Sequence, residues 1–229
     1  MEELLKNIRI QVSDQLFNQD PDSKLLGKKI VRHSIDLIEE IGFEAFTFKK
    51  LGEKIGSPES TIYRYFRNKK QLLMYLTSWY WTWLECRLVF FTNNIVSPQE
   101  RLSRAITVVT QSINHHSEYT YINEVKLNKI IISESFKAFL NKEADEANKL
   151  GYYQVYNRIV ERISDMVLEV SPKFQYPHTL VSTVIEGAHF QKFFSNNIPL
   201  LTDVGKDETK LVNFFTTMVF RMIKNDDEK

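Results

Sequence analysis

Gly42 and Gly56 divide the region between residues 23 and 66 into three segments, and each segment has the apolar spacing of a helix. The first segment begins near Ser23. Its core-facing side chains recur every three or four positions, at Leu26, Ile30, His33, Leu37 and Ile41. This spacing predicts a helix that ends at Gly42, because glycine is common directly after the last helical residue.

The second segment is the run FKKLGEKI at residues 48–55. It places apolar residues on one face of a two-turn helix, and Thr47 stands before it as the expected N-cap. Gly56 ends the run. Ser57 and Pro58 then predict a third helix, with serine as N-cap and proline at the first helical position.

The third segment, ESTIYRYF, carries the chemistry. Ile62 and Phe66 are four residues apart and are expected to face the core. The remaining side chains are expected on the outer face, and they are Glu59, Ser60, Thr61, Tyr63, Arg64 and Tyr65. Hydroxyl, aromatic and guanidinium groups suit phosphates and base edges in a major groove, although exposed tyrosines can also serve packing. Three short helices with a glycine turn before the last one predict a helix-turn-helix.

Charge points to the same region. Residues 22–70 hold 11 Lys/Arg against 7 Asp/Glu, although the whole chain has a formal net charge of only +1. A local basic excess favours a segment that faces nucleic acid, and a chance surplus of surface lysines is the alternative.

The run FEAFTFKKLGEKIGSPESTIYRYFRNKKQLL resembles the DNA-binding domain of tetracycline-repressor-type (TetR/AcrR family) transcriptional regulators. The match covers about residues 24–76 and includes Gly42, Phe43, Phe46, Thr47, Leu51, Gly56, Thr61, Ile62, Tyr63, Tyr65, Phe66, Lys69 and Leu72. The resemblance implies that Tyr63 lies at the base-edge and backbone surface of the recognition helix. It also implies that Tyr65 and Lys69 contact phosphates, and that Thr47 caps the second helix against the DNA backbone.

The sequence departs from the family pattern at the start of the third helix. Ser57 and Pro58 stand where the family usually has an apolar residue followed by Ser or Thr, so the cap is open to a shift by one residue. Glu59 replaces a small or basic residue. A carboxylate there can favour the positive end of the helix dipole or accept from a cytosine amino group.

The remaining pattern stays helical, which predicts an all-α chain. Further helices are expected at about residues 69–91, 98–116, 121–141, 145–170, 177–197 and 207–224. Three parts follow: an N-terminal extension at 1–21 of undetermined structure and role, a three-helix DNA-binding domain with helix-turn-helix at 22–70, and a helical C-terminal ligand-binding and dimerisation domain at 71–229. The function of the last part rests on the resemblance.

The run WYWTW holds all three tryptophans of the chain. Such a cluster can line an aromatic effector pocket or form the core between helices. The candidate effector-binding residues are Tyr75, Trp79, Trp83, Cys86, His115, Tyr119, Tyr121 and Glu124.

The last two predicted helices carry apolar side chains on more than one side. Two such helices from each of two chains would close a four-helix dimer interface, and packing within one chain is the alternative. The candidate interface residues are Leu180, Val184, Gly187, Ala188, Gln191, Phe194, Phe214 and Met218.

Other classes of protein find little support. Cys86 is the single cysteine, so an internal disulfide framework is excluded. The charged N-terminus does not resemble a signal peptide, and the apolar runs are too short to span a membrane. The sequence therefore predicts a cytoplasmic protein without a membrane partner. Adjacent His115 and His116 diverge on a helix, so no metal site and no cofactor are expected. Phosphate-loop, hydrolase-elbow and zinc-protease motifs are absent from the sequence, so it is not expected to be an enzyme.

Together these features predict a homodimeric regulator that binds a double-stranded DNA operator. The resemblance favours a repressor released by a small apolar or aromatic effector. Two alternatives remain: a DNA-binding adaptor controlled by a protein partner, and a helical enzyme or carrier with a relic DNA-binding domain.

Overall fold

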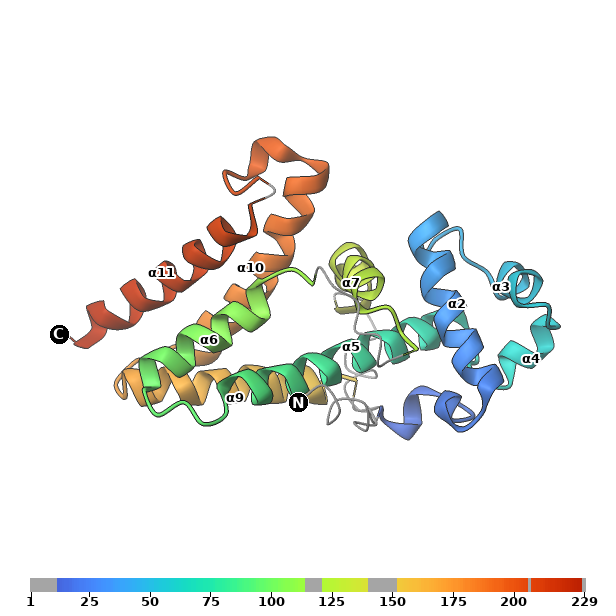
Figure 1. Ribbon diagram of the computed structural model, residues 1–229, viewed down its shortest axis with the longest axis horizontal. Coiled ribbons are helices and arrows are strands. Elements are labelled where there is room, and N and C mark those ends of the chain that lie inside the picture. The colour runs from blue at the N-terminus through green and yellow to red at the C-terminus, as the bar shows by residue number, and fades with distance from the viewer. Residues whose placement is uncertain (1–11, 114–120, 140–151, 206, 228–229) are drawn as a thin grey trace. The chain divides into compact units, whose positions relative to one another are not determined.

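The computed structural model describes residues 12–113, 121–139, 152–205 and 207–227, and the regular elements in these ranges are helices. This confirms the all-α prediction. Figure 1 labels these helices. The chain divides into two compact units. Unit 1 comprises Met1–Thr82 and Ile113–Gln154, and unit 2 comprises Trp83–Ser112 and Val155–Lys229. Unit 1 therefore contains more than the segment 22–70 that the sequence marks as the DNA-binding part.

Unit 1 contains the three short helices that the glycine spacing predicts. They are α2 (Leu25–Ile41), α3 (Phe48–Ile55) and α4 (Glu59–Tyr63). Helix α2 ends at Gly42, whose φ of 78° suits glycine. Helix α4 is shorter than expected. The backbone N–H groups of Tyr65 and Phe66 both donate to the Ile62 carbonyl oxygen, so the chain turns there instead of continuing the helix.

Two further helices contribute to the described part of unit 1. The long helix α5 (Lys69–Thr92) contributes its first 14 residues to this unit, and α7 (Glu124–Phe139) packs on α2. Asn68 caps α5, because its side-chain oxygen accepts from the Gln71 backbone N–H at 2.8 Å. The segment before α2 forms two single-turn 3₁₀ helices, η1 (Asp14–Leu16) and η2 (Pro21–Ser23), a structure that the sequence left open.

Unit 2 is built from the end of α5 and four further helical elements. These are α6 (Pro98–Thr110), α9 (Gln154–Val170, all but its first residue), α10 (Pro177–Asn197) and α11 (Glu208–Asp227), with the 3₁₀ turn η3 (Pro199–Leu201) after α10. Helix α6 ends at Thr110, earlier than the predicted residue 116. Helix α9 begins nine residues later than predicted, since Tyr152 and Tyr153 form a turn. Residues 114–120 and 140–151 of the predicted helices lie outside the described ranges.

Across the described ranges, every helix is too short or too polar to cross a lipid bilayer.

Candidate nucleic-acid interface

The turn between α3 and α4 depends on two glycines. Gly56 adopts the left-handed conformation with φ 66°, which reverses the chain after α3 at no steric cost. Gly52 lies against the turn itself, because a Cβ there would approach the Ser57 carbonyl oxygen to 2.6 Å. Thr47 caps the start of α3 as predicted, with its hydroxyl accepting from the Lys50 N–H at 3.2 Å. The helix-turn-helix geometry is therefore fixed by backbone contacts.

The start of α4 differs from the expectation. Pro58 is the N-cap residue, and α4 begins at Glu59 without a side-chain cap, so Ser57 is not the cap. Ser57 belongs to the turn instead, because its N–H donates to the Gly52 carbonyl oxygen at 2.9 Å. This is the shift by one residue that the departure from the family pattern left open.

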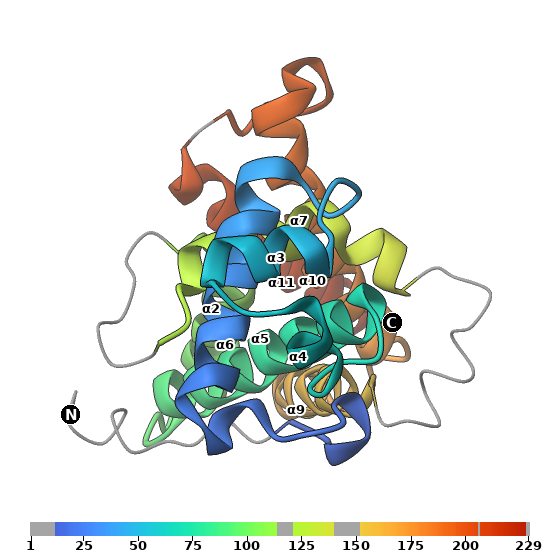
Figure 2. The same ribbon diagram turned by 90° about the vertical axis from the view of Figure 1, so that its right-hand side faces the viewer.

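Helix α4 faces the viewer in Figure 2. Its outer face presents polar side chains to solvent. Ser60 and Arg64 are exposed, Thr61 is half-buried, and the Tyr63 side chain is 47% exposed. The Tyr63 ring leans edge-on against Phe48 of α3, with ring centroids 5.0 Å apart. Ile62 is fully buried, as the spacing predicts. One side of α4 thus packs on the unit and the other side offers hydroxyl and guanidinium groups.

Glu59 acts on Tyr63 one turn away. Desolvation and, after it, the charge of Glu59 and a hydrogen bond to it raise the pKa of the Tyr63 phenol above its ordinary value. The hydroxyl is therefore protonated at neutral pH and can donate a hydrogen bond. Glu59 also lies in the first turn of α4, where a carboxylate favours the helix dipole.

Tyr65 requires a correction. The sequence placed it on the outer face of the third helix, but its side chain is 2% exposed. The chain leaves the helical path after Tyr63, and this turns Tyr65 into the core beside Phe66. A buried phenol has no access to a DNA phosphate, so the expected phosphate contact of the Tyr65 side chain is wrong.

Lys69 has a different set of contacts from the expected phosphate. Its ammonium donates to the carbonyl oxygens of Phe43 at 3.1 Å, Glu44 at 3.0 Å and Phe46 at 3.4 Å. The same group lies 4.9 Å from the Phe43 ring centroid. Lys69 therefore ties the α2–α3 loop to the start of α5. Its phosphate contact stays a prediction, and an ammonium that has three carbonyl acceptors gives that prediction no support.

Two polar residues that the sequence did not single out lie beside the end of α4. Asn18 donates through its backbone N–H to the Tyr65 carbonyl oxygen at 2.8 Å and through Nδ2 to the Tyr63 carbonyl oxygen at 3.3 Å. Its Oδ1 accepts from Nε of Arg67 at 3.1 Å. Arg67 was visible only as one of the basic residues in the 22–70 excess. Asn18 had no sequence signal, because these contacts are long-range.

The predicted effector residues are divided between the two units, and their joint site stays a prediction. Tyr75, Trp79, Tyr121 and Glu124 belong to unit 1, Trp83 and Cys86 belong to unit 2, and His115 and Tyr119 lie outside the described residues. Trp79 and Trp81 are 2% and 1% exposed and are part of the unit 1 core. Tyr121 donates to the Asp22 carboxylate at 2.5 Å and interacts with Tyr75.

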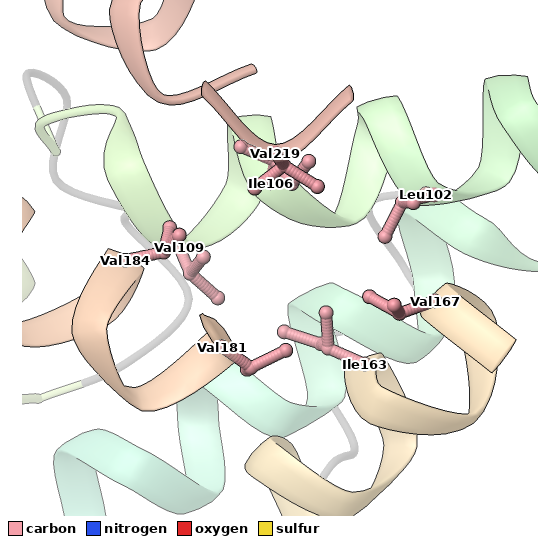
Figure 3. Close-up of a pocket in the computed structure, with 8 residues that line it drawn as sticks. All are labelled: Leu102, Ile106, Val109, Ile163, Val167, Val181, Val184 and Val219. Atoms are coloured by element: carbon pink, nitrogen blue, oxygen red, sulfur yellow. The ribbon is translucent and has the colours of Figure 1, made fainter. Parts of the chain in front are cut away.

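A small apolar cavity lies elsewhere, within unit 2 (Figure 3). It has a volume of about 10 Å³, which is about the space that one water molecule needs. Eight aliphatic side chains of α6, α9, α10 and α11 line it, and they are Leu102, Ile106, Val109, Ile163, Val167, Val181, Val184 and Val219. None of the predicted effector residues is among them.

Helix α10 also carries a buried ammonium. Lys192 is 7% exposed, and its Nζ donates to the Gln111 carbonyl oxygen at the end of α6 at 2.9 Å. Burial lowers the pKa of Lys192 to about 8, partly offset by the charge of Glu208. Capping the negative end of α6 gives this lysine a structural role.

The predicted dimer interface is corrected in part. Leu180, Val184 and Ala188 are at most 3% exposed within the single chain, and a Cβ on Gly187 would lie 3.0 Å from the Phe215 ring. These positions pack α10 on other helices of unit 2, so the alternative of packing within one chain is the right one for them. Gln191, Phe194 and Met218 are half-buried. Phe214 of α11 is 54% exposed.

Comparison with known proteins identifies the N-terminal part. Residues 30–76 match the model of the family of bacterial regulatory proteins, tetR family. The tetracycline repressor protein class A from transposon 1721 of Escherichia coli is 37% identical over 51 residues, which is 22% of this chain and 24% of the repressor. The match with this curated relative thus spans about a quarter of the relative's length.

Solved structures share the fold over most of the chain. The regulator PfmR from Thermus thermophilus superposes with a TM-score of 0.56 and 14% identity, over 85% of this chain and 94% of that chain. AibR, in complex with isovaleryl coenzyme A and operator DNA, gives a TM-score of 0.55 and 13% identity, over 83% and 97%. At these identities the likeness concerns the fold alone. Residues 30–76 are therefore similar to the bacterial regulatory proteins of the tetR family, and the chain shares its all-α fold with a solved transcriptional regulator of that family.

Proposed function

We propose that this protein is a transcriptional regulator that binds an operator in double-stranded DNA through α4. The observation that carries the proposal is the exposed outer face of α4, where Ser60, Tyr63 and Arg64 project from a helix whose other side packs on α3. A helix of this kind enters a major groove with its polar side chains at base edges and phosphates. Residues 22–70 hold this activity, residues 71–229 serve dimerisation and effector binding, and the protein acts in the cytoplasm.

The regulator works as a homodimer. Two copies of α4 in successive major grooves lie about 34 Å apart, which a two-fold symmetric dimer on a palindromic operator provides. Phe214 and Met222 of α11 support this proposal, because they are 54% and 46% exposed on a helix whose other side is buried. Large apolar side chains on one exposed helix face are typical of a subunit interface.

The effector is a small apolar molecule that binds in unit 2. The aliphatic cavity there supports this choice, although it must widen to admit more than a water molecule. AibR is similar in fold, and its structure holds isovaleryl coenzyme A and operator DNA together, so isovaleryl coenzyme A, whose acyl chain is apolar, is a first probe. A ligand that binds more tightly to a conformation with low affinity for DNA would shift the population toward that conformation and release the operator. Repression would then be relieved.

The test is a mobility-shift titration with DNA from upstream of the gene that encodes this protein. We expect binding that is specific over random DNA and that weakens steeply with salt, because each phosphate contact releases counterions. Equal affinity for upstream and random DNA at every salt concentration would contradict operator binding.

The same complex then decides how the protein is controlled. Isovaleryl coenzyme A and octanoate are added while DNA release and tryptophan fluorescence are followed together. Release and a fluorescence change at one concentration range support the effector, because linkage ties both to one binding free energy. Specific DNA binding that neither these probes nor a wider panel of apolar metabolites affects would favour control by a protein partner.

A further inference from the structure

The segment before α2 forms part of the surface around α4. Asn18 uses its backbone N–H, its side-chain amide and its side-chain carbonyl on three different groups: the carbonyl oxygens of Tyr65 and Tyr63, and Nε of Arg67. The last carbonyls of a helix have no partner within the helix. Asn18 therefore closes the C-terminal end of α4 from a position 45 residues away in the sequence.

Contacts on both sides fix the position of Asn18. On one side, Leu16 is 1% exposed and packs with Met74 and Tyr152, and Phe17 meets the Tyr75 ring edge-on at 6.0 Å. On the other side, the Asp22 carboxylate accepts a hydrogen bond from the Tyr121 hydroxyl at 2.5 Å. Leu16 lies in the core of unit 1, and Phe17 and Asp22 are half-buried. Asn18 is therefore held by its neighbours' contacts and not by its own hydrogen bonds alone.

Arg67 is fixed in turn at its backbone and at one side-chain nitrogen. Its backbone N–H donates to Oε1 of Gln71 at 2.7 Å, and its Nε donates to Asn18. The side chain is exposed, and its four Nη hydrogens extend beyond the nitrogen that Asn18 holds. A guanidinium with a fixed plane pairs with two phosphate oxygens at once, and less rotamer entropy is lost when it does so.

We propose that Arg67 contacts an operator phosphate next to α4, and that Asn18 is the positioning residue that aims it. This inference rests on the proposed operator binding. It assigns a DNA-binding role to Asn18, which lies in the N-terminal extension 1–21 whose role could not be determined from the sequence. It also supplies a basic contact directly before α5, where the Lys69 ammonium is engaged by the carbonyls of the α2–α3 loop.

The test compares operator affinity across a salt series for the full chain and four variants. These are Arg67→Gln, Asn18→Ala, the double variant, and Arg104→Gln as a control that removes the same charge from an exposed position on α6. Each variant is measured at a temperature at which circular dichroism shows it fully folded, so that loss of fold cannot cause the change.

Arg67→Gln is expected to lower the slope of log affinity against log salt by about 1, the value for one phosphate contact, whereas Arg104→Gln leaves the slope unchanged. Asn18→Ala is expected to weaken binding about threefold or more in the parent. In the Arg67→Gln background it should weaken binding by less than about 1.5-fold, because the two residues act through one contact.

Each outcome decides the proposal. A parent-like salt slope in Arg67→Gln overturns the phosphate contact. Equal losses from Asn18→Ala in both backgrounds overturn the positioning role, since Asn18 would then act on α4 without Arg67. A parent protein that shows no specific DNA binding contradicts the proposed function itself. A parent that binds specifically, together with an Arg67→Gln variant that binds equally well, contradicts only the inference on Arg67.

Discussion

The ammonium of Lys69 lies 4.9 Å from the ring centroid of Phe43 and donates to the Phe43 carbonyl oxygen at 3.1 Å. With the carbonyls of Glu44 and Phe46, this makes one lysine the tie between the α2–α3 loop and the start of α5. These contacts give the basic side chain of Lys69 a structural role that does not depend on a phosphate.

Lys69→Ala is therefore expected to act on stability. Hydrogen bonds to a charged donor are lost, and for this half-buried group we expect the free energy of unfolding to fall by about 1–2 kcal/mol. The salt slope of operator binding should stay within about 0.3 of the parent slope. Urea unfolding and mobility shifts measure the two effects. A slope reduced by about 1, with unchanged stability, would restore Lys69 as a phosphate contact.

Tyr63 and Tyr65 are two residues apart and are expected to respond in opposite ways. Tyr65→Ala empties a buried site and should lower the free energy of unfolding by about 3 kcal/mol. Tyr63→Ala, at a 47% exposed position, should cost less than about 1 kcal/mol but should reduce discrimination between operator and random DNA. Thermal unfolding and competition binding separate the two. Full discrimination in Tyr63→Ala would exclude its side chain from sequence reading.

The exposed face of α11 is the place to test dimerisation. Phe214→Asp puts a charge where the proposed interface is apolar, so it should give monomers and weaken operator binding at least about tenfold by removing the second half-site contact. Val96→Asp makes the same kind of change at a 94% exposed position and should remain dimeric. Sedimentation of both variants measures the effect. A parent protein that is monomeric at micromolar concentration would exclude the homodimer.

Lys192 predicts a dependence of stability on alkaline pH. Its pKa is about 8 in the folded chain against an ordinary value of 10.5, because burial disfavours the charged form. Between these values the unfolded chain binds more protons than the folded chain, so the free energy of unfolding rises with pH. The rise is at most about 1.4 kcal/mol per pH unit.

Urea unfolding from pH 7.5 to 9.5 measures this rise below the range in which tyrosines of the unfolded chain ionise, near pH 10. Lys192→Met should remove the rise, and Lys210→Met, at an exposed position on α11, should keep it. An identical pH profile in the parent and in Lys192→Met would show that Lys192 is not the group responsible.

The local pattern of the sequence predicted the helices of the N-terminal part well. Gly42 and Gly56 end α2 and α3, and Thr47 caps α3, because these choices depend on neighbouring residues alone. Apolar spacing also predicted that Ile62 and Phe66 would be buried. The candidate face of α4 was predictable for the same reason, apart from its final turn.

The tertiary structure decided the positions of those side chains whose contacts come from distant parts of the sequence. Tyr65 turns inward because the chain leaves the helix after Tyr63. The ring of Phe215, from another helix, packs where a side chain at position 187 would lie. Asn18 reaches the end of α4 only in the folded chain. By itself, the sequence determined the all-α class, the helix-turn-helix and its exposed polar face, since helix periodicity and capping are local. The orientation of individual side chains on that face was set by packing between distant segments, which periodicity does not encode.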